Sequence, residues 1–148
     1  MNRTSDIFKM ALIRLLKAGE DINKINVKDI AEESTYSCQT FYTYYQNKND
    51  LIEAIIYDEF KILLDFLRNE KQTAEAIFTY IFKSKDLYHQ LLNNPAFNSF
   101  KNQTLHYSND YLELIELAIL LTTINYWDSN AYNISIEDIV ELYKAHKR

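Results

Sequence analysis

One stretch of the chain, VKDIAEESTYSCQTFYTYYQNKNDL, places two short amphipathic segments on either side of a polar turn. Val27, Ile30 and Ala31 recur at i, i+3 and i+4, which is the spacing of one face of a helix. The side chains of the following Ser-Thr-Tyr-Ser run compete for backbone hydrogen bonds, and Ser37 is a suitable N-cap for a second helix over about 38–45. Two short helices around a tight turn predict a helix-turn-helix.

The rest of the chain carries few residues that break helices. Only one glycine and one proline occur in 148 residues, whereas sheet-rich chains need turn residues at short intervals. We therefore expect an all-α protein with at least seven helices. A three-helix head over 1–48 should carry the helix-turn-helix, and a long connecting helix should lead into a small helical bundle over 49–148 that dimerises.

Apolar periodicity and capping residues set the expected helix bounds. Gly19 should end the first helix as its C′ residue, and Asn26 should cap the second. Asn49, Asp110 and Ser135 are the expected caps of three later helices. Besides the two helices of the motif, helices are predicted over 4–18, 50–70, 73–82, 86–92, 96–106 and 111–127, and from 135 onwards.

The segment 111–127 is apolar on nearly every side, so it should be buried on nearly every side. A body of this size cannot easily surround such a helix, and a second subunit is the natural cover. We expect this helix and the last one to form a four-helix bundle with their two-fold mates. The predicted dimer interface comprises Leu112, Ile115, Ile119, Leu120, Trp127, Ile136, Ile139, Val140 and Tyr143.

Charge and composition narrow the function classes. The net charge is −5, but residues 1–50 hold seven Lys/Arg and seven Asp/Glu, so all the excess acid lies in the body. A neutral head argues mildly against nucleic acid. One cysteine excludes an intrachain disulfide and suits a reducing cytoplasm, and neither a signal peptide nor a membrane-spanning run is visible. No phosphate loop, nucleophile motif or His pair at helical spacing occurs, so we expect a cytoplasmic protein that is not an enzyme and needs no cofactor or metal.

The motif resembles the N-terminal domain of TetR-family transcriptional regulators, and the resemblance covers about 65 residues. The residues that carry it, in order and spacing, are Val27, Ile30, Ala31, Ser37, Thr40, Phe41, Tyr42, Tyr44, Tyr45, Asn47, Lys48, Asp50 and Leu51. The C-terminal part, with Tyr126-Trp127 and then Ser-Ile-Glu-Asp-Ile, resembles the short domain of firmicute members. Thr35 departs from the family, which usually has glycine there, so this position should need a left-handed backbone.

The resemblance implies a homodimer that binds double-stranded DNA at a pseudo-palindromic operator, with heads about 34 Å apart, and acts as a repressor. The second helix of the motif would enter the major groove, where Gln39 could pair with adenine. By resemblance, Tyr42 and Lys48 would contact phosphate, while Phe41 and Tyr45 form core. The predicted DNA-binding residues are Asn26, Val27, Lys28, Ser37, Cys38, Gln39, Thr40, Tyr42, Thr43 and Lys48.

Two questions stay open at the level of sequence. The body aromatics Phe78, Phe82, Tyr88, Phe100 and Tyr107 either line a pocket for an effector or fill the core, and helical spacing favours core. If they line a pocket, a small molecule would control the protein; if they fill the core, control by a protein partner is the better explanation. The alternative function is an all-helical protein-interaction module whose helix-turn-helix-like head binds DNA weakly or not at all.

Overall fold

The computed structural model describes residues 3–102 and 109–147, and every regular element in these two ranges is an α-helix. This confirms the expected all-α class. The helices are α1 (Thr4–Lys17), α2 (Val27–Ser34), α3 (Cys38–Tyr44), α4 (Lys48–Arg68), α5 (Ala74–Lys83), α6 (Lys85–Leu92), α7 (Pro95–Asn102), α8 (Tyr111–Ser129) and α9 (Ile136–His146). None of them is long and apolar enough to cross a membrane.

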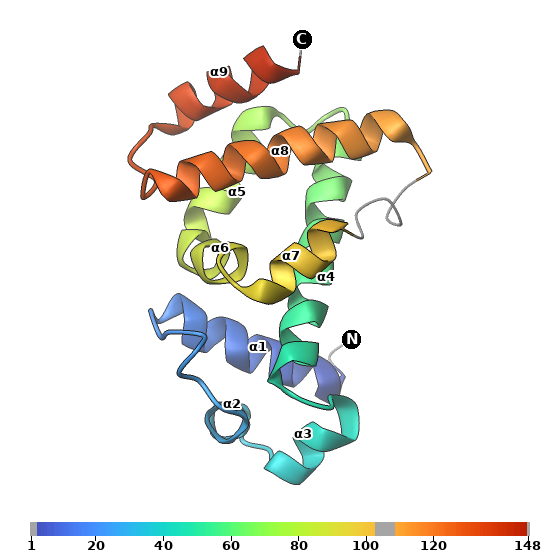
Figure 1. The fold of residues 1–148 in the computed structure, drawn as a ribbon, viewed down its shortest axis with the longest axis vertical. Helices are drawn as coiled ribbons and strands as arrows, with labels where there is room; N and C mark the ends of the chain where they lie inside the picture. Colours follow the sequence, from blue (N-terminus) through green and yellow to red (C-terminus); the bar gives the residue numbers. More distant parts are fainter. Residues whose placement is uncertain (1–2, 103–108, 148) are drawn as a thin grey trace.

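Helices α1 to α3 form a small head at one end of the molecule (Figure 1). Helix α4 leaves the head and runs into the body, where α7 and α8 pack against it. Helix α8 crosses the far end of the body, and α9 folds back along it while also contacting α5. The two ends of the molecule are thus a head made of short helices and a broad face made by α8 and α9.

Local capping explains most of the helix ends. Gly19 has φ +92°, and the N–H groups of Gly19 and Glu20 donate to the carbonyls of Leu16 and Leu15 at 3.0 and 3.1 Å. This is the Schellman arrangement, so the predicted role of Gly19 is confirmed. The expected caps Asn26, Asp110 and Ser135 likewise accept N–H groups of the first turns of α2, α8 and α9.

Several predicted helix starts shift by one or two residues, and the shifts of α4 and α7 have a clear local cause. Helix α4 begins at Lys48 because Asn47, and not Asn49, accepts the N–H of Asp50 at 2.9 Å. Helix α7 begins at Pro95 rather than at Ala96, since proline lacks the N–H that would be unpaired at a first helical position. Both shifts lie within the usual uncertainty of helix ends.

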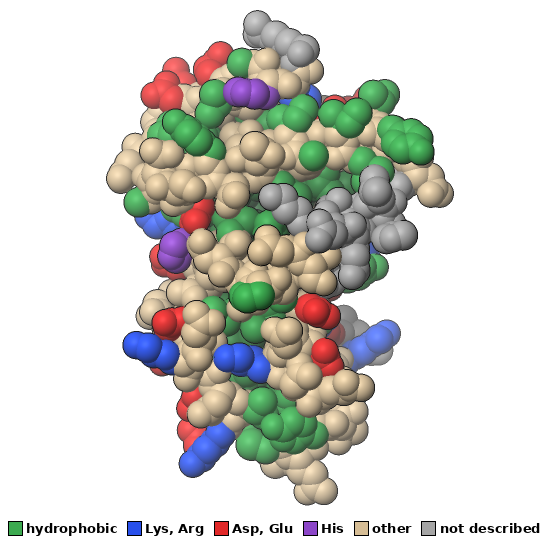
Figure 2. Space-filling view, in the orientation of Figure 1, with side chains coloured by type: hydrophobic (Ala, Val, Ile, Leu, Met, Phe, Trp, Pro, Cys, Tyr) green, Lys and Arg blue, Asp and Glu red, His purple; other side chains and the backbone are tan. Residues whose placement is uncertain are grey.

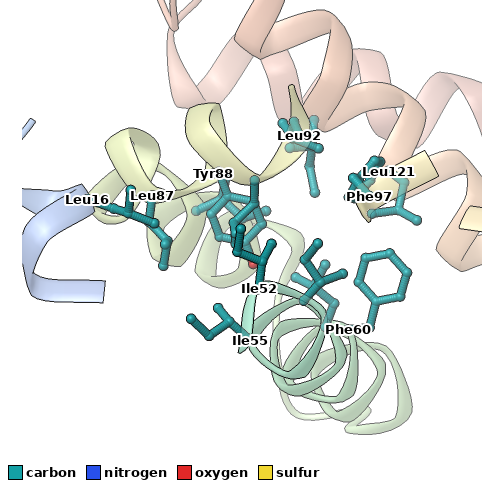
Figure 3. Packing of buried hydrophobic residues seen from close by; sticks show 14 of the residues in the cluster. Leu16, Ile52, Ile55, Phe60, Leu87, Tyr88, Leu92, Phe97 and Leu121 are labelled. Carbon is teal, nitrogen blue, oxygen red and sulfur yellow. The ribbon is translucent and has the colours of Figure 1, made fainter. Parts of the chain in front are cut away.

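A single hydrophobic core runs from the head into the body. In Figure 3, Leu16 of α1 lies beside Leu87 of α6, and the α4 residues Ile52, Ile55 and Phe60 continue the cluster towards Phe97. The side-chain carbonyl of Gln90 also accepts the N–H of Ile22 in the α1–α2 connector at 3.1 Å. The core is therefore continuous across residue 48, and the domain boundary predicted there remains a prediction.

The α8–α9 pair corrects half of the predicted dimer interface. Five of the predicted interface residues are almost fully buried within the one chain, because α9 packs on α5 and α8, and α8 packs on α4 and α6; they are Leu120, Trp127, Ile139, Val140 and Tyr143. These belong to the chain's own core. The interface remains a prediction for Leu112 and Ile115, which are 73% and 55% exposed, and for the half-buried Ile119 and Ile136.

The predicted effector pocket is filled. Phe78 is completely buried between Trp127 and Tyr143, with ring centroids 5.7 and 5.4 Å away, and the Phe82 ring centroid lies 5.7 Å from that of Trp127. Tyr88 borders a void of only about 10 Å³, room for no more than a water molecule. Phe78 and Tyr88 belong to the core, and the half-buried Phe82 packs against it, as aromatics at helical spacing usually do. The Phe100 side chain and Tyr107 lie outside the described residues.

Candidate nucleic-acid interface

Helix α2 has a first turn that is fixed by a reciprocal pair of hydrogen bonds. The Asn26 side chain accepts the N–H of Asp29, and the Asp29 carboxylate accepts the N–H of Asn26, both at 2.9 Å. Ile30 and Ala31 bury one face of the helix, while Lys28 is exposed. Val27 is half-buried against the core, so its contribution to a ligand is its backbone N–H at the helix N-terminus.

The turn between α2 and α3 is closed by serine side chains. Ser34 is buried, donates to the carbonyl of Ala31 at 2.7 Å and accepts the N–H of Tyr36 at 3.1 Å. Thr35 has φ +67°, the left-handed conformation expected at this position. Ser37 accepts the N–H of Thr40 at 3.1 Å and caps α3 as predicted. The turn thus holds its shape without glycine.

Helix α3 is anchored by one buried aromatic side chain. Phe41 is fully buried and meets Phe8 of α1 edge to face, with ring centroids 5.3 Å apart. Tyr45 follows the helix, is half-buried, and donates its hydroxyl to the carbonyl of Ser5 at 2.9 Å. The assignment of Phe41 and Tyr45 to the core of the head is confirmed, and it fixes which face of α3 points outward.

The outward face of α3 carries Gln39, Thr40 and Thr43. Both threonine hydroxyls are engaged locally: Thr40 with Ser37 at 2.9 Å, and Thr43 with the carbonyl of Gln39 at 3.2 Å. Their methyl groups remain available for apolar contact. The Gln39 amide is exposed and has no partner among the described residues. Cys38 is partly exposed at the start of the helix.

Lys48 has a structural role that the sequence did not indicate. Its ammonium donates to the carbonyls of Ile22 and Ile25 in the α1–α2 connector, each at 2.8 Å. An ammonium carries three donors, so one hydrogen remains for a phosphate. The phosphate contact of Lys48 therefore stays a prediction. Its hydrogen bonds to the two carbonyls position the connector and, through it, α2.

Much of the positive charge of the head is already paired. Arg14 bonds the carboxylate of Glu33 at 3.0 Å, and Lys9 bonds that of Asp58 at 2.9 Å. Burial lowers the pKa of Lys9, but the hydrogen bond and negative charge of Asp58 outweigh it and leave the pKa raised. Helix α3 has no charged residue, and its tip in Figure 2 shows mainly apolar and uncharged polar atoms.

Sequence reasoning overlooked two exposed tyrosines at this surface. Tyr36 in the turn is 42% exposed and Tyr44 at the end of α3 is 48% exposed, comparable to Tyr42 at 56%. The rotation of α3 that buries Phe41 leaves Tyr42 and Tyr44 on opposite flanks of its outward face, because positions two apart lie about 200° apart around a helix. That spacing was visible in the sequence once Phe41 was assigned to the core.

A second polar cluster joins α6 to α8. The nearly buried carboxylate of Asp128 accepts from His89 Nδ1 at 3.0 Å and from the Asn93 amide at 3.1 Å. Sequence spacing did not reveal this pair, because its members are 39 residues apart. No group of three or more His, Cys, Asp or Glu side chains within the described ranges could hold a metal ion. The hydrogen bonds of His89 and Asn93 to Asp128 tie the end of α6 to α8.

A comparison with known proteins finds a relative that covers part of the chain. The chain is 30% identical over 104 residues to an uncharacterized HTH-type transcriptional regulator, YxbF, of Bacillus subtilis (strain 168). The aligned part is 62% of this chain and 27% of that protein, so the chain spans about a quarter of the length of the curated relative it matches. No family model and no solved structure matches the chain. The chain is thus similar to a protein named for a helix-turn-helix.

Proposed function

We propose that the protein is a helix-turn-helix regulator of transcription of the TetR type, which binds double-stranded DNA. The observation that carries the proposal is the outward face of α3: Gln39 and Thr43 are exposed, Thr40 is partly exposed, and the Gln39 amide is unused by the fold. Side chains of this kind contact base edges in a major groove. The similarity to an HTH-type transcriptional regulator supports it.

In this proposal the neighbouring elements hold the DNA backbone. The first-turn N–H groups of α2, at Val27 and Lys28, point to a phosphate together with the exposed Lys28 ammonium. Ser37, Cys38 and Tyr42 lie where α3 enters the groove. Contacts of these groups would set the register of the head, and Gln39 would supply sequence preference.

The protein would act as a homodimer formed through the outward side of α8. This side has an apolar groove of about 550 Å³ lined by Ile115, Ala118, Ile119, Thr122, Tyr126, His146 and their neighbours, and Figure 2 shows green side chains along it. Small Ala118 and Thr122 lie between large Ile115 and Tyr126, so two copies of α8 could cross closely at the small pair. Such a dimer would place two heads on a pseudo-palindromic operator.

We propose repression as the mode of action, by a dimer whose operator overlaps the promoter and excludes polymerase. The packed aromatic cluster around Phe78 leaves no room for a ligand. A protein partner or a ligand bound elsewhere in the body would then control DNA binding, by favouring one separation of the heads.

An electrophoretic shift with duplex DNA from the gene's own promoter region tests the proposal. We expect a shift at low salt, and Gln39→Ala should change which sequence is preferred without loss of folding. Absence of a shift for the folded dimer would instead favour the protein-interaction module.

Sedimentation tests the dimer separately. Ala118→Arg should give a monomer at micromolar concentration, because it places a charge at the helix crossing. Ala145→Arg is the matched control, since Ala145 is an exposed alanine of α9 that does not line the groove. A wild-type monomer at micromolar concentration contradicts the proposed interface.

A further inference from the structure

Helix α3 carries no charged side chain with which to read a base. Its sequence is CQTFYTY, so it has neither a cation nor a carboxylate. Guanine is most often read by arginine or lysine, which donate to its O6 and N7 acceptors, and the amino group of cytosine can be read by a carboxylate. The helix therefore lacks both of the usual charged readers of a G·C pair. The non-aromatic polar side chains on its outward face are those of Gln39, Thr40 and Thr43.

The Gln39 amide is exposed and has no hydrogen-bond partner among the described residues. It offers a donor and an acceptor side by side. Adenine presents the complementary pair in the major groove, the N7 acceptor and the N6 donor, whereas guanine presents two acceptors. Against guanine the amide oxygen would meet another acceptor and stay unsatisfied. The Gln39 side chain therefore favours adenine.

Thr43 lies four residues after Gln39, is exposed, and donates its hydroxyl to the Gln39 carbonyl at 3.2 Å. A hydroxyl has a single hydrogen, so this one is not free for the acceptors of guanine. The methyl group of Thr43 remains, and its partner in the major groove is the C5-methyl group of thymine. Four residues advance a helix by about 6 Å and base pairs lie about 3.4 Å apart, so Gln39 and Thr43 meet different base pairs of one half-site.

We propose that the base pairs read by α3 are A·T pairs, with the Gln39 amide on an adenine and the Thr43 methyl group on the C5-methyl group of a thymine. This inference rests on the proposed function and names the class of operator sequence that the head takes. Each of the two contacts complements an A·T pair, and α3 has no charged group that would favour a G·C pair in its place. Discrimination between sequences then comes from one amide and from apolar contact.

Selection and a uracil scan test the inference. Duplexes with a random core are selected on the whole chain, and each thymine of the preferred duplex is replaced, at the matching positions of both half-sites, by uracil, which lacks only the C5-methyl group. Loss of one methyl contact weakens binding about fourfold, hence about fifteenfold for two half-sites. We expect one thymine per half-site with this effect. If every uracil replacement changes the affinity by less than about twofold, the inference is wrong.

Two substitutions of Thr43 separate its methyl group from its hydroxyl. Thr43→Ser keeps the hydroxyl and removes the methyl group, so thymine and uracil should bind within about twofold of each other at that position. Thr43→Val keeps a methyl group and removes the hydroxyl, so the difference of about fifteenfold should persist. The reverse result would assign the base contact to the hydroxyl and overturn the inference.

Thr79→Ser is the matched control for the serine variant. Thr79 of α5 likewise donates its hydroxyl to the carbonyl four residues earlier, that of Glu75 at 2.7 Å, but it lies outside the head. This variant should show the wild-type difference between thymine and uracil. Because Thr43 is exposed and Phe41 anchors α3, neither Thr43 variant should unfold the head, and circular dichroism checks this.

The outcomes distinguish this inference from the function on which it rests. If no duplex is recovered at low salt, the proposed function fails, and the inference fails with it. A duplex in which Gln39→Ala alters the preference only at G·C pairs would leave DNA binding intact and overturn the inference. If instead Gln39→Ala relaxes the preference at an A·T pair from about tenfold or more to less than about threefold, the role of the amide is confirmed.

Discussion

The head and the body differ in the kind of side chain that they leave exposed to solvent. The head buries Phe8, Phe41 and its neighbours and leaves polar Gln39 and half-exposed tyrosines outside. The body buries its largest aromatics just as completely but leaves Leu112 and Ile115 of α8 exposed. A polar outward face suits the wet, charged surface of DNA, whereas an apolar one suits another protein surface.

The two regions are nevertheless joined by more than the α4 backbone. Leu16 packs near Leu87, and Gln90 accepts the N–H of Ile22 in the connector that leads into α2. The same connector accepts two hydrogen bonds from Lys48. Hydrogen bonds thus tie the connector before α2 to both α6 and α4. Experiments can test most directly whether the head and the body unfold independently of each other.

The largest effect is expected for Phe78→Ala in the body. Removal of this fully buried ring should lower the free energy of unfolding by about 3–5 kcal/mol. Because the core is continuous, Trp127 fluorescence, which reports the body, and far-UV circular dichroism, which reports all helices, should show one coincident transition.

Phe82→Ala on the same helix is the matched control for this substitution. Its ring is only half-buried, so the loss of stability should be smaller. A second transition in circular dichroism, with the head still folded after Trp127 is exposed, would contradict a single folding unit and support the boundary at residue 48.

The same contrast explains what the sequence could predict. Gly19, Asn26 and Ser37 act through hydrogen bonds within a few residues, so their roles followed from local spacing. Thr35 likewise has the backbone conformation that its place in the motif required. The head is thus encoded mostly by short-range patterns.

Long-range partners could not be predicted in this way. Helix α8 is apolar on nearly every side, so periodicity could not tell the face with Leu120 and Trp127, which is buried in the chain, from the face with Leu112 and Ile115. The carbonyls that bind Lys48 lie more than 20 residues before it, and no local pattern marks them. Such contacts are set by the packing of whole helices.

An intermediate effect is expected for Lys48→Met. This substitution tests whether Lys48 stabilises the fold of the head, contacts DNA, or does both. The substitution leaves the carbonyls of Ile22 and Ile25 without their charged donor and should cost about 2–3 kcal/mol in thermal or denaturant unfolding. Lys24→Met, on the same connector, is the control and should change stability by less than about 0.5 kcal/mol. Unchanged stability together with a flatter salt dependence of DNA binding would mean that Lys48 serves phosphate alone.

The smallest effect is expected at the junction between the regions, for Glu59→Gln. Glu59 of α4 is buried and accepts hydrogen bonds from the hydroxyls of Tyr80 and Tyr88, each at 2.9 Å. Burial raises its pKa above the ordinary value, although the two phenols oppose this. The folded state therefore binds this proton more tightly than the unfolded state does, so the stability that Glu59 contributes is complete at acid pH and is lost as pH rises through the folded-state pKa.

Glutamine stays neutral at every pH, and its amide can accept from one phenol and donate to the other. Unfolding in denaturant at a series of pH values should thus show Glu59→Gln gaining stability relative to the wild type, by about 1 kcal/mol, as the pH rises above about 4. Glu53→Gln, the same change at a partly exposed position of α4, is the control and should show no such trend. If the difference between Glu59→Gln and the wild type were independent of pH, the carboxylate would have the same proton affinity in both states, and the hydrogen bonds from the two phenols would fully offset its burial.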